Sequence, residues 1–229
     1  MKNSLQTLQF LQLADSAFPT GEFSYSFGLE AAAHLGQIPT YEALVEYLDA
    51  YLRQLSHADL AFINSSYDIN PDTETPLLLS VLTEWHAFLT TPSIRHSNRI
   101  LGENWCELIE VTFKPADLRG LVTAIDELNQ PKYFTIVFGI LLKFLGYSLS
   151  DVQELFLYIS LRDQLNAAVR LGLIGSRRSQ KVLYQFGPRC CELVRDNKDL
   201  DYTMSYKSEP IIEIAQASHH TIYSRLFQN

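Results

Sequence analysis

Two serines in the segment ADSAFPTGEFSYSFGLEAAAHLG are the first candidates for chemistry. Ser24 and Ser26 precede Gly28 and nearly match the Gly-x-Ser-x-Gly turn that presents the catalytic serine of many hydrolases. That turn, centred on Ser26, would need glycine at position 24, and no strand is predicted before it. A serine nucleophile is therefore one interpretation. We favour the other, in which Ser24 or Ser26 caps the free backbone N–H groups of the following helix.

The sequence offers no recognisable motif for a nucleotide or a metal ion. It has no Gly-x-x-x-x-Gly-Lys-Ser/Thr loop, the usual cradle for a nucleoside triphosphate. No two histidines have His-x-x-x-His spacing, and none lies at ligand spacing from a cysteine. Cys190 and Cys191 point in different directions on a helix, and His219 and His220 are interpreted as polar residues of an exposed tail. We predict no catalytic residue, no cofactor and no metal site.

Three polar residues form a ladder along an otherwise apolar helix. Arg162, Asn166 and Arg170 follow one another at intervals of four, which places them on the same side of that helix. One interpretation is a solvated helix edge. The other is a protein-binding surface, where arginine is enriched because its planar guanidinium forms directional hydrogen bonds.

Composition limits the class of protein. The chain has 229 residues, 47% of them hydrophobic, and a net charge of -8. A chain of this length can bury a core without disulfides, and its scattered cations argue against binding nucleic acid. Three cysteines without paired spacing suit a reducing compartment. The N-terminus does not resemble a signal peptide, and the longest apolar run, 133–145, is shorter than the ~20 residues of a membrane helix. We expect a cytoplasmic protein.

Helical periodicity dominates the elements that must position these residues. The segment Tyr41–Leu55 places leucines on one face and charges on the other, with Thr40 as its N-cap and an Asp49–Arg53 pair. Prolines open three further helices, which are predicted over 75–89, 92–113 and 115–130. The sequence therefore predicts an all-α single domain of about eight to ten helices.

The second half of the chain continues this pattern and then loses it. The run 132–146 has the β-branched and aromatic content of a strand, but its length without a turn favours a buried helix. Ser150 and Gln153 form a predicted capping box before one long helix, and Ser176 opens another after Gly175. Periodicity fades after Asn197. We predict a helical domain at 1–197 and a flexible, poorly packed tail at 198–229.

Four blocks of the sequence together resemble the urease accessory protein UreF family. They are LQLADSAFPTGEFSYSFGLEAAAHLG, IRHSNRILG, NAAVRLGLIG and YSRLFQN, and the resemblance extends over nearly the whole chain. The chain departs from the family pattern at 172–175, where Pro-Leu-Gly is usual, and at His220, where glutamate is usual. The positions that match the pattern are Asp15, Ser16, Pro19, Gly21, Ser26, Gly28, Leu29, Glu30, Arg95, Ser97, Arg99, Gly102, Asn166, Ala168, Arg170, Leu171, Tyr223, Ser224, Arg225, Leu226 and Phe227.

The resemblance implies a scaffold protein that is not an enzyme. UreF-like proteins bind the UreD (UreH) accessory protein, recruit the GTPase UreG and modulate its GTP hydrolysis, so that nickel reaches the urease apoprotein. The resemblance also implies a homodimer. With the polar ladder, it gives a set of predicted partner-binding residues, which are Pro19, Gly21, Ser26, Glu30, Arg162, Asn166, Arg170, Tyr223, Arg225, Leu226 and Phe227.

Two other classes of function stay open at this point. One is a generic helical adaptor unrelated to nickel, and the other is an all-α enzyme with an enclosed pocket. For the UreF interpretation, the tail makes a specific prediction about partner binding. Because residues 218–229 carry large apolar side chains after a polar tract, we expect them to be mobile in the isolated protein and to become ordered when a UreD-like partner binds.

Overall fold

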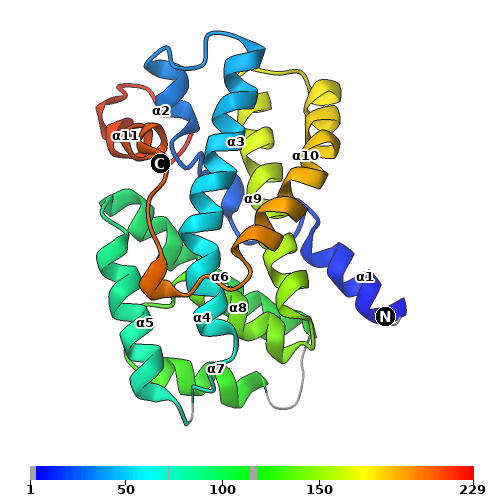
Figure 1. Ribbon diagram of the computed structural model, residues 1–229, viewed down its shortest axis with the longest axis vertical. Coiled ribbons are helices and arrows are strands. Elements are labelled where there is room, and N and C mark those ends of the chain that lie inside the picture. The colour runs from blue at the N-terminus through cyan, green and yellow to red at the C-terminus, as the bar shows by residue number, and fades with distance from the viewer. Residues whose placement is uncertain (1–3, 72, 114–117) are drawn as a thin grey trace.

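The computed structural model describes residues 4–71, 73–113 and 118–229, and these residues form an all-helical body (Figure 1). No strand occurs in these ranges, so the all-α prediction is confirmed. The α-helices are α1 (Ser4–Leu13), α2 (Leu29–His34), α3 (Tyr41–His57), α4 (Asp59–Tyr67), α5 (Thr75–Phe88), α6 (Pro92–Phe113), α7 (Leu118–Glu127), α8 (Phe134–Phe144), α9 (Leu149–Arg170), α10 (Ser176–Asn197) and α11 (Pro210–Ser218). The short 3-10 turns are η1 (Glu22–Ser24), η2 (Tyr202–Met204) and η3 (His219–Thr221).

Several predicted helix starts are confirmed. Thr40 caps α3 by accepting a hydrogen bond from the Ala43 N–H at 3.2 Å, and Asp49 forms an ion pair with Arg53. α5 begins at Thr75, directly before Pro76, α6 begins at Pro92, and α10 begins at Ser176. Pro115, the predicted start of the helix observed as α7, lies outside the described residues.

The capping box before α9 lies two residues earlier than predicted. The Ser148 hydroxyl accepts a hydrogen bond from the Asp151 N–H, and the Asp151 carboxylate accepts one from the Ser148 N–H, both at 3.3 Å. The predicted partner Gln153 is buried and donates to Asn64 at 2.6 Å instead. The predicted capping box of Ser150 and Gln153 was wrong, because the Gln153 side chain is buried against α4 and does not cap the helix.

The core is centred on α8, which is a buried helix as favoured from the sequence. Every residue from Phe134 to Leu142 is buried. Phe138 packs against Trp105 of α6 and Phe156 of α9, with ring centroids 5.1 and 5.5 Å apart. Gly102 lets α6 approach this region closely, since a β-carbon there would lie 1.9 Å from the Lys132 carbonyl oxygen. α8 is thus the element around which α4, α6 and α9 assemble.

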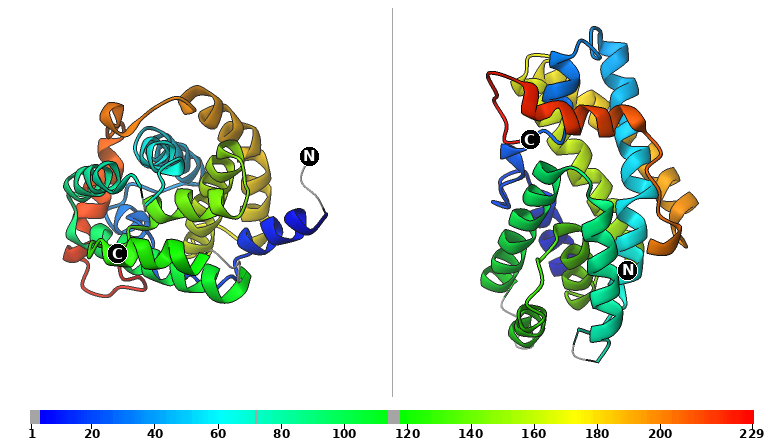
Figure 2. Two further views of the ribbon diagram at one scale, coloured as in Figure 1. Left: turned by 90° about the horizontal axis from the view of Figure 1, so that it is seen from below. Right: turned by 90° about the vertical axis from the view of Figure 1, so that its left-hand side faces the viewer.

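The prediction of a poorly packed C-terminal tail is wrong for the residues that the domain buries. After α10 the chain crosses beside α4, where the Asn64 amide donates to the Leu200 carbonyl at 2.8 Å and Tyr206 stacks on His57 at 4.6 Å. α11 then lies beside α2 and α3, as the right-hand view of Figure 2 shows. Ile212 and Phe227 are 0% and 5% exposed. The sequence pattern did not predict this packing, because the segment is held by single side chains that contact distant helices and not by a periodic apolar face.

No helix within the described residues is long and apolar enough to cross a lipid bilayer.

Candidate functional site

The last residues of the chain dock into the turn between α1 and α2. We call residues 222–229 the C-terminal clasp and residues 19–28 the elbow. The Asn229 carbonyl oxygen accepts hydrogen bonds from the Ser26 N–H at 3.1 Å and from the Ser26 hydroxyl at 2.5 Å. The Asn229 side chain accepts from the Phe27 N–H at 3.1 Å and donates to the Ser97 hydroxyl at 2.7 Å. Ser26, Ser97 and Asn229 are all buried, so the clasp closes over their polar groups.

Glu30 is the main anchor of the clasp. Its carboxylate accepts hydrogen bonds from the Leu226 N–H at 2.6 Å and the Phe227 N–H at 3.2 Å. The His219 Nε2 lies 3.0 Å from the same carboxylate, and both side chains are buried. Thus His219 is not the exposed tail residue predicted from the sequence. One buried carboxylate holds three groups that are about 190 positions away in the sequence.

Arg170 joins α9 to both the elbow and the clasp. Its guanidinium donates to the Phe23 carbonyl and lies 4.2 Å from the centroid of the Phe227 ring. Cation–π contacts of this kind contribute about 0.5–1 kcal/mol at exposed sites. The structure therefore brings together residues from the first, third and fourth sequence blocks.

Arg162, at the other end of the polar ladder, faces the protein interior. Its guanidinium donates to both carboxylate oxygens of Asp163 at 2.8 Å and to the Ala14 carbonyl at 2.7 Å, and it lies 3.4 Å from Glu22. Burial raises the pKa of Glu22 well above its usual value, and the nearby Asp163 charge raises it further. The donors of Arg162 are used within the chain, whereas Arg170 is exposed. Asn166 lies between them and is half-buried.

The elbow depends on two glycines with left-handed backbone conformations. Gly21 has φ 93° and Gly28 has φ 99°, a region that residues with a β-carbon rarely adopt. A β-carbon on Gly28 would also lie 3.0 Å from the side chain of Gln216 in α11. The predicted turn between two helices is confirmed, with Pro19 and Gly21 between α1 and α2. Of the predicted capping serines, Ser26 accepts from the Glu30 N–H at 3.4 Å.

The clasp carries both buried and exposed side chains. Phe227 is buried, whereas Tyr223, Arg225 and Leu226 are exposed, with Tyr223 at 103% and Leu226 at 60%. Phe23 of the elbow, whose carbonyl Arg170 binds, is 72% exposed. We call Phe23, Tyr223, Arg225 and Leu226 the exposed face of the clasp. Large apolar side chains that remain exposed beside a fixed backbone are typical of protein-binding surfaces.

Sequence reasoning did not select Ser97, His219 and Asn229 as site residues. Ser97 belongs to the second sequence block, which could have identified it, but His219 and Asn229 carry no local pattern. No group of three or more His, Cys, Asp or Glu residues in the described part of the chain is placed to hold a metal ion. The arrangement is one of hydrogen-bonded anchors below an exposed apolar face, and it suits recognition of another protein.

Comparison with known proteins gives this geometry a family context. The UreF family model matches residues 38–187. Urease accessory protein F of Oryza sativa subsp. indica is 27% identical over 220 residues, covering 94% of this chain and 82% of the rice protein. Urease accessory protein UreF of Trichodesmium erythraeum is 26% identical, with 98% and 97% covered, and that of Paenarthrobacter aurescens is 28% identical, with 97% of each chain covered. The family model spans more than half of the chain, and the chain therefore belongs to the UreF family of urease accessory proteins.

Proposed function

We propose that this chain is a non-enzymatic scaffold in urease maturation. In this role it binds a UreD/UreH-like accessory protein, recruits a UreG-like GTPase and modulates its GTP hydrolysis while nickel is inserted into the urease apoprotein. Family membership supports the process, and the names of the relatives give the same process. The observation that carries the proposal for this molecule is the junction of elbow, Arg170 and clasp, because it fixes an exposed apolar face in one place.

We assign the exposed face of the clasp to the UreD/UreH-like partner. Tyr223 and Leu226 supply apolar surface, and Arg225 forms no hydrogen bond or ion pair with the described residues. Aromatic residues and arginine are the types that contribute most at protein interfaces. In this proposal the docked clasp is the conformation that the partner stabilises, and a clasp that is mobile before binding stays a prediction.

A pull-down with candidate UreD-like and UreG-like proteins tests the assignment. Leu226→Asp should abolish capture of the UreD-like protein without changing the melting temperature, because Leu226 is exposed. Arg170→Ala should weaken capture by roughly 2–5 kcal/mol if its guanidinium reaches the partner. Val111→Asp is the matched control, since Val111 is 62% exposed on α6, outside the clasp and the elbow. Full capture by the Leu226→Asp protein would refute the assignment.

We further propose a cytoplasmic homodimer, and α1 offers a suitable surface. Leu5, Leu8 and Leu11 are each at least 60% exposed, and the helix contains no charged residue. α1 also extends away from the helical body (Figure 2). Because the chain has a net charge of -8, an uncharged face lets two copies approach without local repulsion. Light scattering should show a dimer that Leu8→Glu converts to a monomer, and a dimer unaffected by this change would exclude α1 from the interface.

A further inference from the structure

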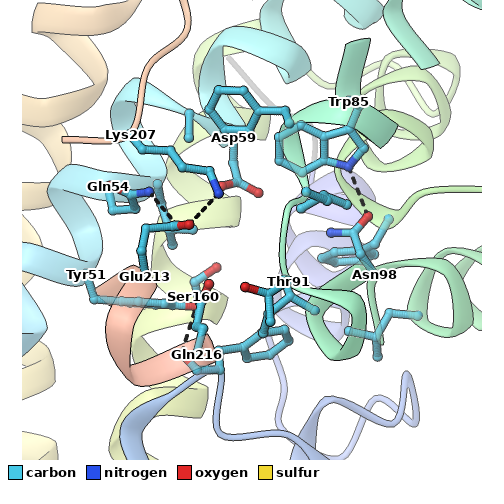
Figure 3. Close-up of a pocket in the computed structure, with 18 of the residues that line it drawn as sticks. Tyr51, Gln54, Asp59, Trp85, Thr91, Asn98, Ser160, Lys207, Glu213 and Gln216 are labelled. Atoms are coloured by element: carbon cyan, nitrogen blue, oxygen red, sulfur yellow. Dashed lines mark hydrogen bonds and ion pairs between the residues drawn. The ribbon is translucent and has the colours of Figure 1, made fainter. Parts of the chain in front are cut away.

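A cavity in the middle of the helical body has no part in the proposed scaffold function. Its volume is about 80 Å³, enough for a few water molecules. Helices α3, α4, α5, α6, α8 and α9 contribute to its walls, and the C-terminal segment closes one side (Figure 3). The aromatic residues of its wall are Phe27, Tyr51, Trp85, Phe88, Phe134 and Phe156.

Two acceptors of this cavity, the Tyr51 hydroxyl and the Asp59 carboxylate, have few hydrogen-bond partners. Tyr51 is only 4% exposed, yet its hydroxyl forms no hydrogen bond with any described residue. Figure 3 shows it extending from α3 towards Ser160 of α9. The Asp59 carboxylate receives the Thr135 hydroxyl at 2.9 Å and forms no ion pair within the described part of the chain. A buried hydroxyl without a partner and a half-buried carboxylate with one side-chain donor favour a ligand that donates hydrogen bonds.

Carboxyl groups outnumber cations around the cavity. Four carboxylates line it, from Glu22, Asp59, Asp163 and Glu213, whereas Lys207 is the one lining cation among the described residues. Lys207 pairs with Glu213, and Arg162 behind the wall pairs with Asp163 and Glu22. Asp59 forms no ion pair in the described part of the chain, although the positive charge of Lys207 acts on it and lowers its pKa. Burial raises the pKa of Asp59 to about 7, which means that the carboxyl tends to hold a proton when nothing else compensates its charge.

We propose that this cavity binds a small monocation of the ammonium class, such as ammonium or methylammonium. Such an ion donates hydrogen bonds in several directions and can use Asp59, Tyr51 and Ser160 as acceptors. The aromatic rings of the lining can attract it further through cation–π contacts. A divalent metal ion fits less well, because it needs several closely clustered ligands, and no such cluster occurs in the described residues.

The chain itself places a primary ammonium group at one end of this cavity. The Lys207 Nζ lies 5.4 Å from the centroid of the Phe88 ring, donates to the Thr90 hydroxyl at 3.0 Å and pairs with Glu213. The Lys207 and Glu213 side chains are 26% and 25% exposed, so this end of the cavity reaches solvent. Trp85, Thr91 and Asp59 supply a further ring, hydroxyl and carboxylate to the lining of the cavity.

Titration of the full chain with ¹⁵N-labelled ammonium chloride tests the proposal. NMR should detect a bound ammonium ion in saturable, millimolar binding, and calorimetry near pH 7 should detect proton release as the ion displaces the Asp59 proton. Asp59→Asn should weaken binding about tenfold or more, since each 1.4 kcal/mol is tenfold in affinity. Lys207→Ala should strengthen it by removing the competing cation. Glu84→Gln, an exposed carboxylate on α5, is the matched control and should change nothing.

Tyr51→Phe keeps the size of the side chain and serves as a second variant if Asp59→Asn fails to fold. It should weaken ammonium binding severalfold while the circular dichroism melt stays close to that of the parent. Tetramethylammonium, which has no N–H donors, should not bind. Non-saturable ammonium signals, equal affinity in the Asp59→Asn and Tyr51→Phe proteins, or equal binding of tetramethylammonium would each overturn the proposal and leave a cavity filled with water.

Discussion

The aromatic core around Phe138 and the C-terminal clasp around Glu30 are held by different forces. In the core, α6, α8 and α9 bury rings that touch one another at centroid distances of 5.1 to 5.5 Å. In the clasp, the main chain is fixed by a few polar bonds to Glu30, Ser26 and Ser97. The stability of the core is distributed over many apolar contacts, whereas the docking of the clasp depends on a few hydrogen-bonding side chains. Single substitutions should therefore separate the folding of the body from the docking of its last residues.

Phe138→Ala should have the largest effect on stability. Phe138 is fully buried, so the loss of its ring leaves a cavity and should lower the free energy of unfolding by about 3–5 kcal/mol. Chemical denaturation measures this loss. Phe144→Ala is the matched control, because Phe144 is 37% exposed at the end of α8 and should change stability by less than about 1 kcal/mol. Equal losses in both variants would show that stability does not concentrate in this core.

Asp59→Asn tests the boundary between the core and the C-terminal segment. The folded-state pKa of about 7 lies above the ordinary value of 3.8, so the folded protein binds this proton more tightly than the unfolded chain. The stabilising contribution of the protonated carboxyl is complete below about pH 4 and is lost as the pH rises to about 7. At pH 8 the variant should be more stable than the parent by up to about 4 kcal/mol, at about 1.36 kcal/mol per pKa unit. Unfolding curves with the same pH dependence in both proteins would contradict this.

Glu30→Ala should release the clasp and spare the core. It leaves the N–H groups of Leu226 and Phe227 and the ring of His219 without their acceptor, which should cost about 1–3 kcal/mol in local stability. Hydrogen exchange should accelerate in residues 219–229 while protection of α8 stays unchanged. Glu42→Ala, an exposed carboxylate on α3, provides the control. Equal loss of protection in α8 would mean that clasp and core unfold together.

Arg170→Ala should have the smallest effect on stability. The exposed guanidinium contributes about 0.5–1 kcal/mol through its contact with Phe227, so the melting temperature should move little. Arg170→Lys keeps the charge but not the planar group, and it should recover only part of this small loss. A loss of several kcal/mol in the alanine variant would assign Arg170 to the core and not to the clasp.

Local patterns in the sequence were sufficient for most helices. The boundaries of α3, α5 and α6 followed from the apolar period, the threonine cap and the opening prolines, because these signals act within one or two turns of the chain. The capping box of α9 was misplaced because Ser148 and Ser150 are each followed, three residues later, by a side chain that can accept a hydrogen bond. Only the burial of Gln153 against Asn64 decides between them.

The candidate site was predictable only in part. The resemblance selected Ser26, Glu30, Arg170 and Phe227 as residue types, but neither it nor the periodicity showed that these residues touch one another. Arg162 and Arg170 looked equivalent on one helix face. Contacts with Asp163 and Ala14 turn the first inward, whereas the second reaches Phe23 and Phe227. Helical spacing specifies a direction, and the neighbouring elements decide what lies there.

The sequence by itself determined that this protein is helical, acidic and similar to UreF proteins, because composition, periodicity and motif residues are properties of the chain alone. The tertiary structure decided that the last residues belong to the folded body. Asn229 and Ser26 are 203 positions apart, and a contact at that separation leaves no periodic trace in either segment. A polar tail therefore looks unstructured until the buried acceptors and donors that receive it have been brought together by the rest of the fold.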